Sequence, residues 1–180
     1  MNLIPSSWST PTFSCEDLQS SEIGLVQELY TASAPVALWD GKEQDPHYIE
    51  LSYHEGILPE GGVKERFRIQ SIRLKTTEEI VGFLSVYHSY PHRDSLYLAM
   101  MCISGDFQNQ GYGQEVMKHF LLEIGLLGYS EVRVNVSLRN WAGLRFWTKS
   151  GFNRISGIFG DKEFAEGKFA DIELINRWSL

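Results

Sequence analysis

The sequence has few of the features that mark disulfide-rich, metal-binding or membrane proteins. Its two cysteines, Cys15 and Cys102, belong to no Cys-x-x-Cys pair, which excludes a disulfide framework and a structural zinc site. The longest unbroken apolar run is the eight residues Leu96 to Ile103, too short to span a bilayer. The amino terminus lacks a basic region followed by an apolar stretch. We therefore expect a cytoplasmic protein that binds neither a membrane nor a metal.

Basic residues are also scarce. Sixteen Lys and Arg against 23 Asp and Glu give a formal net charge of −7, and no basic run is present. This balance excludes a general nucleic-acid binder and favours a small cationic partner. No Gly-x-Ser-x-Gly elbow occurs, so a serine hydrolase has no support. His88 and His92 flank Pro91 and do not form a helical metal-binding pair.

What is present suits a single domain over residues 1–180, with residues 1–11 as a short extended segment. The chain is 43% hydrophobic and 22% charged, enough to bury a core. Periodicity predicts the order β-α-α-β-β-β-α-β-α-β-β. The predicted elements are a strand at 12–18, a helix from Ser20 or Ser21 to Ala34-Pro35, a helix from Asp45-Pro46 to Gly56, a hairpin of 66–74 and 80–87, a strand at 96–103, a helix ending near Gly128, a strand at 131–136, a helix after Asn140, and strands at 153–158 and 169–178. The uninterrupted apolar run at 96–103 predicts a central strand covered on both faces.

A glycine turn, Gln108-Asn109-Gln110-Gly111-Tyr112-Gly113, joins strand 96–103 to the following helix. Glycines let backbone N–H groups approach phosphate oxygens, and the helix amino terminus adds about half a positive charge. A pyrophosphate can therefore bind here without a lysine. No Gly-Lys-Ser/Thr follows, and Val116 stands where a dinucleotide fingerprint has its third glycine, so those two loops are disfavoured.

Two blocks of the sequence resemble the GNAT acyltransferase superfamily. The family's Gln/Arg-x-x-Gly-x-Gly/Ala stands here as Gln108, Gly111 and Gly113. Its Asn-x-x-Ala-x-x-Leu-Tyr-x-Lys-x-Gly-Phe block is similar to Val134-Asn135-Val136 followed by Asn140, Gly143, Phe146, Trp147, Lys149, Gly151 and Phe152. The resemblance is sharp over residues 96–152. It implies an α/β (α+β) acyl-CoA N-acyltransferase fold, with a mixed, mostly antiparallel sheet splayed between strands 96–103 and 131–136 and helices on both faces.

The resemblance also implies that acetyl-CoA or coenzyme A binds in the splay. Pantetheine would pair with backbone groups of 101–103, the amides of 108–113 would hold the pyrophosphate, and Asn140 would both cap a helix and bind the pantetheine arm. The cofactor-binding residues implied in this way are Met101, Cys102, Ile103, Gln108, Asn109, Gln110, Gly111, Tyr112, Gly113, Gln114, Asn140, Gly143, Phe146, Trp147 and Lys149.

The implied reaction is N-acetyl transfer to a primary amine of a small molecule or peptide, by direct attack in a ternary complex. A backbone N–H at Met101 or Ile103 would stabilise the oxyanion. Trp147 stands where the family usually has the tyrosine that protonates the thiolate, and an indole N–H cannot give up its proton. Trp147 is thus either catalytic or a packed core aromatic. Tyr97 and Asn135 fall where different relatives carry a glutamate base.

The general base therefore remains unassigned near Tyr97, with Glu50, His54 and His88 as candidates. Aromatics and carboxylates of the first two helices, the loop between them and the last hairpin suit a cationic amine. The expected acceptor contacts are Trp39, Asp40, Tyr48, Glu50, Tyr53 and Phe164. Two other functions stay open: a non-catalytic acyl-CoA-binding or regulatory module, and a different nucleotide-binding α/β protein. Similar proteins commonly form homodimers, so the resemblance implies a homodimer here too.

Overall fold

A computed structural model describes residues 2–33, 38–39, 41 and 43–178, and its helices and strands follow the predicted order. The first half contains β1 (Ser7–Ser9), β2 (Phe13–Asp17), α1 (Ile23–Ser33), α3 (Tyr48–His54), β3 (Phe67–Leu74) and β4 (Ile80–His88). The second half contains β5 (Ser95–Ile103), α4 (Tyr112–Leu126), β6 (Glu131–Ser137), α5 (Trp141–Lys149), β7 (Arg154–Gly160) and β8 (Ala170–Arg177).

Three boundaries differ from the prediction. Ser20 and Ser21 do not cap the first helix, because they lie in a 3-10 turn, Ser20–Glu22, that Gln19 caps, and α1 begins at Ile23. Strand β1 lies inside the segment 1–11 that was expected to be only extended, because it pairs with β2. Helix α3 begins at Tyr48 and not at Asp45-Pro46, since the Asp45 side chain accepts a hydrogen bond from the backbone N–H of His47 and forms a turn ahead of the helix. The predicted end of the first helix at Ala34-Pro35 lies outside the described residues.

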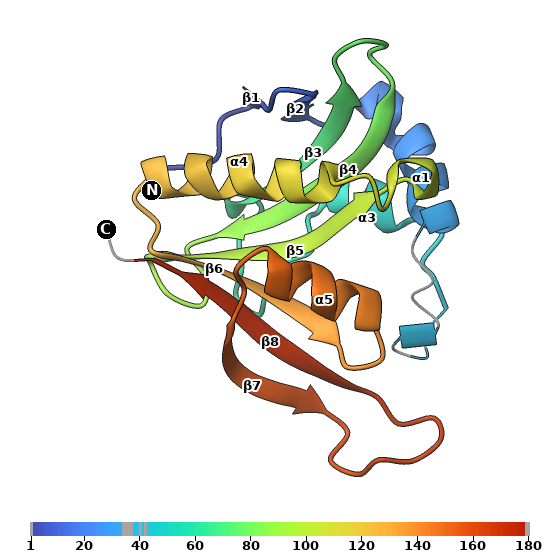
Figure 1. Ribbon diagram of the computed structural model, residues 1–180, viewed down its shortest axis with the longest axis vertical. Helices are drawn as coiled ribbons and strands as arrows, with labels where there is room; N and C mark the ends of the chain where they lie inside the picture. Colours follow the sequence, from blue (N-terminus) through green and yellow to red (C-terminus); the bar gives the residue numbers. More distant parts are fainter. Residues whose placement is uncertain (1, 34–37, 40, 42, 179–180) are drawn as a thin grey trace.

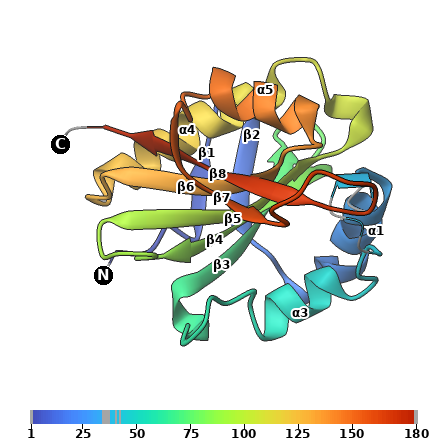
Figure 2. The same ribbon diagram turned by 90° about the horizontal axis from the view of Figure 1, so that it is seen from below.

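The strands form one sheet in the order β1-β2-β3-β4-β5-β6-β8-β7 (Figure 1). All neighbouring strands are antiparallel except β5 and β6, which are parallel because α4 connects them as a crossover. Helices α4 and α5 cover one face of the sheet, and α1 and α3 cover the other (Figures 1 and 2). The predicted mixed, mostly antiparallel sheet with helices on both faces is confirmed.

Strands β5 and β6 separate soon after they start. They pair only from Ser95, opposite Glu131, to Tyr97, opposite Arg133, although β5 continues to Ile103 and β6 to Ser137. Figure 1 shows the two strands diverging toward the amino-terminal end of α4. We call the space between them the β5–β6 gap. The predicted splay is therefore present.

A bulge in β5 lies beside this gap. The register with β4 steps from Met100, opposite Ser85, to Leu98, opposite Val86, so Ala99 has no partner. The extra residue reverses the alternation of side chains along the strand. As a result Tyr97 and Met100 both pack toward the α1–α3 face.

Strand β5 is central and packs into the cores on both faces, as its apolar run predicted, but its second half is only partly buried. Ala99, Met100, Met101 and Ile103 are all partly exposed, whereas every residue of β4 is buried. Strand β4 has a paired neighbour on each side along its length, but β5 loses β6 after Tyr97. The missing neighbour leaves the second half of β5 open to a ligand.

Candidate functional site

The loop before α4 presents a row of unused backbone donors. Asn109 and Gly111 have positive φ angles of 59° and 86°, and Gly111 is the amino-terminal cap of α4. Within the described part of the chain, the N–H groups of residues 109–114 donate to no protein acceptor. Free N–H groups at a helix amino terminus form an anion site. The loop is therefore suited to a pyrophosphate.

The backbone N–H of Gln108 is not free to bind the pyrophosphate, in contrast to the prediction. Its backbone N–H is already bonded to the carbonyl of Gly105 at 3.2 Å, so the phosphate-binding row begins at Asn109. The Gln108 side chain donates to the carbonyl of Ile103 at 2.7 Å, and that of Gln110 donates to the carbonyl of Asp106 at 2.7 Å. The Gln108 side chain thus ties the loop to β5, and the Gln110 side chain braces the loop internally.

Residues near the amino terminus of the chain pack against the start of α4 and support the same loop. The ring of Tyr112 lies edge-on to Phe13, with 5.1 Å between centroids. Glu115, in the first turn of α4, accepts hydrogen bonds from the Thr10 hydroxyl at 2.5 Å and the Thr12 backbone N–H at 2.8 Å. Although burial acts the other way, the bonds from Thr10 and Thr12 lower the pKa of Glu115. The start of α4 is therefore fixed by β2 and the turn before it.

The open edge of β5 offers two further donors. The Ser104 N–H donates to the Val81 carbonyl of β4 at 2.8 Å. Because backbone groups alternate in direction along a strand, Cys102 also faces β4, while Met101 and Ile103 face the gap. The expectation that all three residues offer backbone groups is thus corrected: Met101 and Ile103 do, and the Cys102 backbone is directed toward β4.

Helix α5 borders the gap on the other side. Asn140 caps it, its Oδ1 accepting from the Gly143 N–H at 2.8 Å, which leaves the amide Nδ2 for another partner. Gly113 allows α4 to approach α5 closely, since a Cβ there would lie 2.9 Å from the Phe146 ring. The Gln114 side chain donates to the Phe146 carbonyl at 3.1 Å and holds the two helices together.

Trp147 and Lys149 do not lie at the phosphate loop. The Trp147 side chain is buried between Phe146 and Phe152, at ring distances of 4.8 and 5.1 Å, which favours the packed-aromatic interpretation. Lys149 is exposed and lines a separate groove with later turns of α4 and Trp178. No residue of 108–113 lines that groove.

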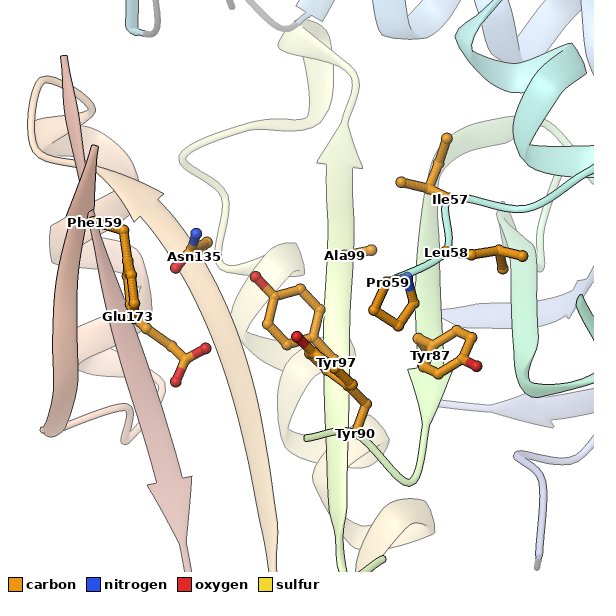
Figure 3. A pocket seen from close by; sticks show the side chains of 10 residues that line it. All are labelled: Ile57, Leu58, Pro59, Tyr87, Tyr90, Tyr97, Ala99, Asn135, Phe159 and Glu173. Atoms are coloured by element: carbon orange, nitrogen blue, oxygen red, sulfur yellow. The ribbon is translucent and has the colours of Figure 1, made fainter. Parts of the chain in front are cut away.

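A cavity of about 360 Å³ lies on the α1–α3 face of the sheet at the mouth of the gap (Figure 3). Its walls come from both sides: Tyr97 and Ala99 from β5, Asn135 from β6 and Glu173 from β8. The complete lining is Ile57, Leu58, Pro59, Tyr87, Tyr90, Tyr97, Ala99, Asn135, Phe159 and Glu173. A second substrate that enters this cavity would contact a ligand bound in the β5–β6 gap.

The polar groups of this cavity are few. Asn135 and Glu173 are register partners, so their side chains lie together on one face, and Figure 3 shows the Glu173 carboxylate directed toward Tyr97. Burial, followed by the charge of Glu173, raises the pKa of Tyr97 to about 12. In the described part of the chain, neither the Tyr97 hydroxyl nor the Asn135 amide has a hydrogen-bond partner.

Glu173 was missed in the sequence. The alternation within 169–178 predicted the strand, but no local signal distinguishes Glu173 from the neighbouring acid Asp171. Only the register with Asn135 brings it to the mouth of the gap.

The predicted acceptor residues do not meet in the cavity. Tyr48 is stacked on Tyr30 at 4.6 Å in the core, and Glu50 is exposed and paired with His47 at 3.1 Å. The Trp39 carbonyl accepts from the Ser137 hydroxyl near the end of β6, and Phe164 is fully exposed. Tyr53 packs on the α1–α3 core, and Asp40 lies outside the described residues.

Neither candidate histidine lies in the cavity. His88 is buried, with Nδ1 3.0 Å from the Tyr129 hydroxyl and Nε2 accepting from the Ile4 N–H at 3.4 Å. Burial, and then the charge of Arg68, lowers the pKa of His88 to about 4. His54 is exposed beside Tyr53. His88 is thus a structural residue of the closed end of the sheet and not a base.

The described residues contain no group of three or more His, Cys, Asp or Glu side chains arranged to hold a metal ion. Nor do they include a helix with the length and apolar character needed to cross a bilayer.

Comparisons with known proteins agree with this geometry. Residues 26–152 match a family model described as "Acetyltransferase (GNAT) family". An acetyltransferase from Thermus thermophilus superimposes with a TM-score of 0.70 at 20% identity, covering 95% of this chain and 100% of that one. The ribosomal-protein-S18-alanine N-acetyltransferase from Escherichia coli gives 0.69 at 14% identity, covering 93% and 95%. A chimera of spermidine N-acetyltransferase from Vibrio cholerae gives 0.69 at 11%, covering 92% and 95%. A comparison with curated proteins finds no match.

Proposed function

The chain belongs to the GNAT acetyltransferase family, and from that premise we propose that it transfers the acetyl group of acetyl-CoA to a primary amine of a small molecule or peptide. The attack is direct, in a ternary complex. The observation that carries the proposal is the row of unused N–H groups at residues 109–114, next to a gap that opens into a separate cavity.

The donor side of the gap fits coenzyme A through backbone groups. The N–H groups of 109–114 hold the pyrophosphate, and the Asn140 amide binds the pantetheine arm. The N–H groups of Met101 and Ile103 face the same space and complete the edge of β5. Acetyl-CoA supplies the acetyl group as an activated thioester.

The acceptor side fits an amine that enters through the cavity. The neutral amine attacks the thioester carbonyl carbon, so that a C–N bond forms and the C–S bond breaks. Of the two protons that the ammonium loses, one goes to solvent and one reaches the departing thiolate. The N–H of Met101 or Ile103 stabilises the oxyanion. Because Trp147 cannot release a proton, the Tyr97 hydroxyl passes its proton to the thiolate and takes up the second proton of the amine in its place.

One observation favours a second function on the same fold. Trp147 replaces the expected tyrosine and is packed between two phenylalanines, so this position supplies no proton to a departing thiolate. A non-catalytic acyl-CoA-binding module would bind coenzyme A normally and acetylate no amine.

Ligand-induced stabilisation and thiol release together test the proposal. Coenzyme A at millimolar concentration should raise the melting temperature, because it binds only the folded state. Acetyl-CoA with spermidine, phenethylamine or a peptide beginning with alanine should then release thiol. Stabilisation without thiol release from any amine would favour the non-catalytic module. The absence of stabilisation, or displacement of coenzyme A by NADH or ATP, would contradict both functions.

A further inference from the structure

The carboxylate of Glu173 is held in the cavity with half of its bonding capacity unused. Its side chain is 13% exposed and lies beside Asn135 on the sheet. Oε1 accepts from Arg133 Nη1 at 2.8 Å and from the Ser156 hydroxyl. In the described part of the chain, no residue hydrogen-bonds to Oε2. Because Glu173 lines the cavity and Oε2 has no protein donor, this oxygen is free to accept a hydrogen bond from a ligand.

The partner of Glu173 cannot turn away to serve another ligand. Arg133 donates through Nε to Glu131 Oε1 at 2.6 Å, and this second carboxylate is buried. Glu131 is in turn bound by Arg177 Nε at 2.7 Å and lies 2.9 Å from His92 Nε2. Arg133 is thus fixed between two carboxylates. It orients Glu173 and is not available to bind an acidic substrate.

The other walls of the cavity are apolar and aromatic. The Tyr97 and Tyr90 rings are perpendicular at 5.7 Å, and Tyr90 is likewise edge-on to Tyr87 at 6.1 Å (Figure 3). Phe159 closes the side next to Glu173. Aromatic rings attract cations, and the described lining includes no Lys, Arg or His that could pair with a substrate carboxylate.

From these features we infer that Glu173 determines acceptor specificity by binding the ammonium group of the acceptor through Oε2. The inference rests on the proposed function and names its substrate class. The acceptor is a small primary amine on a short apolar or aromatic arm, without a carboxylate beside the amine. A cavity of about 360 Å³ is at the small end of the range for ligand sites, which favours a small molecule over a peptide.

A matched pair of ligands tests the carboxylate rule. Phenethylamine and phenylalanine have the same aromatic arm and differ only in the carboxylate beside the amine. We expect calorimetric titration into coenzyme A-saturated protein to show phenethylamine binding at least roughly tenfold more tightly. This measurement does not depend on turnover, so it separates a wrong substrate class from a failure of the proposed acetyl transfer. Equal affinity, or tighter binding of phenylalanine, would overturn the inference.

A matched pair of variants tests the role of Glu173. The substitution Glu173→Gln keeps an oxygen for Arg133 and Ser156 but removes the charge, and should weaken phenethylamine binding by roughly 10- to 100-fold. Asp171→Asn removes the same charge from the same strand face, outside the described cavity lining, and should change binding by less than about threefold. Unchanged melting stabilisation by coenzyme A would show that both variants fold. If the two variants weakened phenethylamine binding equally, or neither did, Glu173 would not be the binding residue.

Discussion

The coenzyme A site and the cavity, which meet at the β5–β6 gap, use different kinds of chemical group. On the loop and β5 side, the usable groups are backbone N–H groups of 109–114, Met101 and Ile103. On the cavity side, they are side chains, chiefly Tyr97 and Glu173. A backbone site depends on φ and ψ angles and tolerates many side chains, whereas the cavity depends on side-chain identity. Coenzyme A binding should therefore be sensitive to changes of backbone conformation, and acceptor binding and catalysis to changes of side chain.

The largest difference is expected from a pair of glycines at the two ends of α4. Gly111 and Gly128 have φ angles of 86° and 87°, and a Cβ at either position would meet no atom within 4 Å. Valine at either site strains the backbone similarly, but only Gly111→Val displaces the phosphate-binding N–H groups. We expect Gly111→Val to weaken coenzyme A binding by roughly three orders of magnitude in calorimetry, and Gly128→Val to leave the affinity within about threefold. Equal losses of coenzyme A affinity in both variants would show that the N–H groups around Gly111 do not bind the pyrophosphate.

Acidification should lower the stability of the fold through His88, which is buried at the end of the sheet where β5 and β6 are paired. The pKa of His88 is about 4 in the folded state against 6.5 for the unfolded chain. The unfolded chain therefore binds the proton first, and stability falls as the pH drops from 6.5 toward 4. The loss approaches about 3 kcal/mol in urea unfolding followed against pH.

The variant His88→Gln is the control for this prediction. It should flatten the curve between pH 6.5 and 4 and leave the later loss from Glu131. The pKa of Glu131 is lowered to about 2, because bonds from Arg133 and Arg177 outweigh the opposing effect of burial. That carboxylate therefore stabilises the fold above pH 4.5 and loses this effect as the pH falls toward 2. A steep loss above pH 4.5 in His88→Gln would assign the transition to another group.

A smaller effect is expected from Tyr97→Phe, on the side-chain side of the gap. Loss of the proton-donating hydroxyl should reduce kcat for an amine about tenfold, without changing the coenzyme A-induced melting shift. Because the pKa of Tyr97 is raised to about 12, its ionisation should cause no fall in wild-type activity up to about pH 10. A wild-type kcat that declines near pH 9 and a Tyr97→Phe enzyme without that decline would show that the hydroxyl ionises earlier.

The smallest effect on catalysis is expected from Trp147→Phe. The indole is packed between Phe146 and Phe152, so its loss should lower stability by about 1–2 kcal/mol and leave kcat within about threefold. Chemical denaturation and steady-state kinetics measure the two quantities. A fall of more than about thirtyfold in kcat with unchanged stability would instead place the indole in the reaction.

The same division explains which features could be predicted. Gln108, Gly111 and Gly113 indicated the phosphate loop because a sharp turn before a helix needs a fixed local spacing. The bulge at Ala99 could not be read from the uniformly apolar run 96–103, which has no alternation to interrupt. The sequence does not show that His88 is a structural residue, because its burial against Tyr129 depends on residues distant in the chain.

The sequence by itself determined the order of elements, the family and the loop that faces the pyrophosphate, since each depends on residues close together in the chain. The tertiary structure decided the acceptor side. Glu173 reaches the cavity only through the register of β8 on β6, and its orientation comes from Arg133 on the neighbouring strand. Strand register is a long-range property that also depends on the packing of α4 and α5, so local composition cannot encode it.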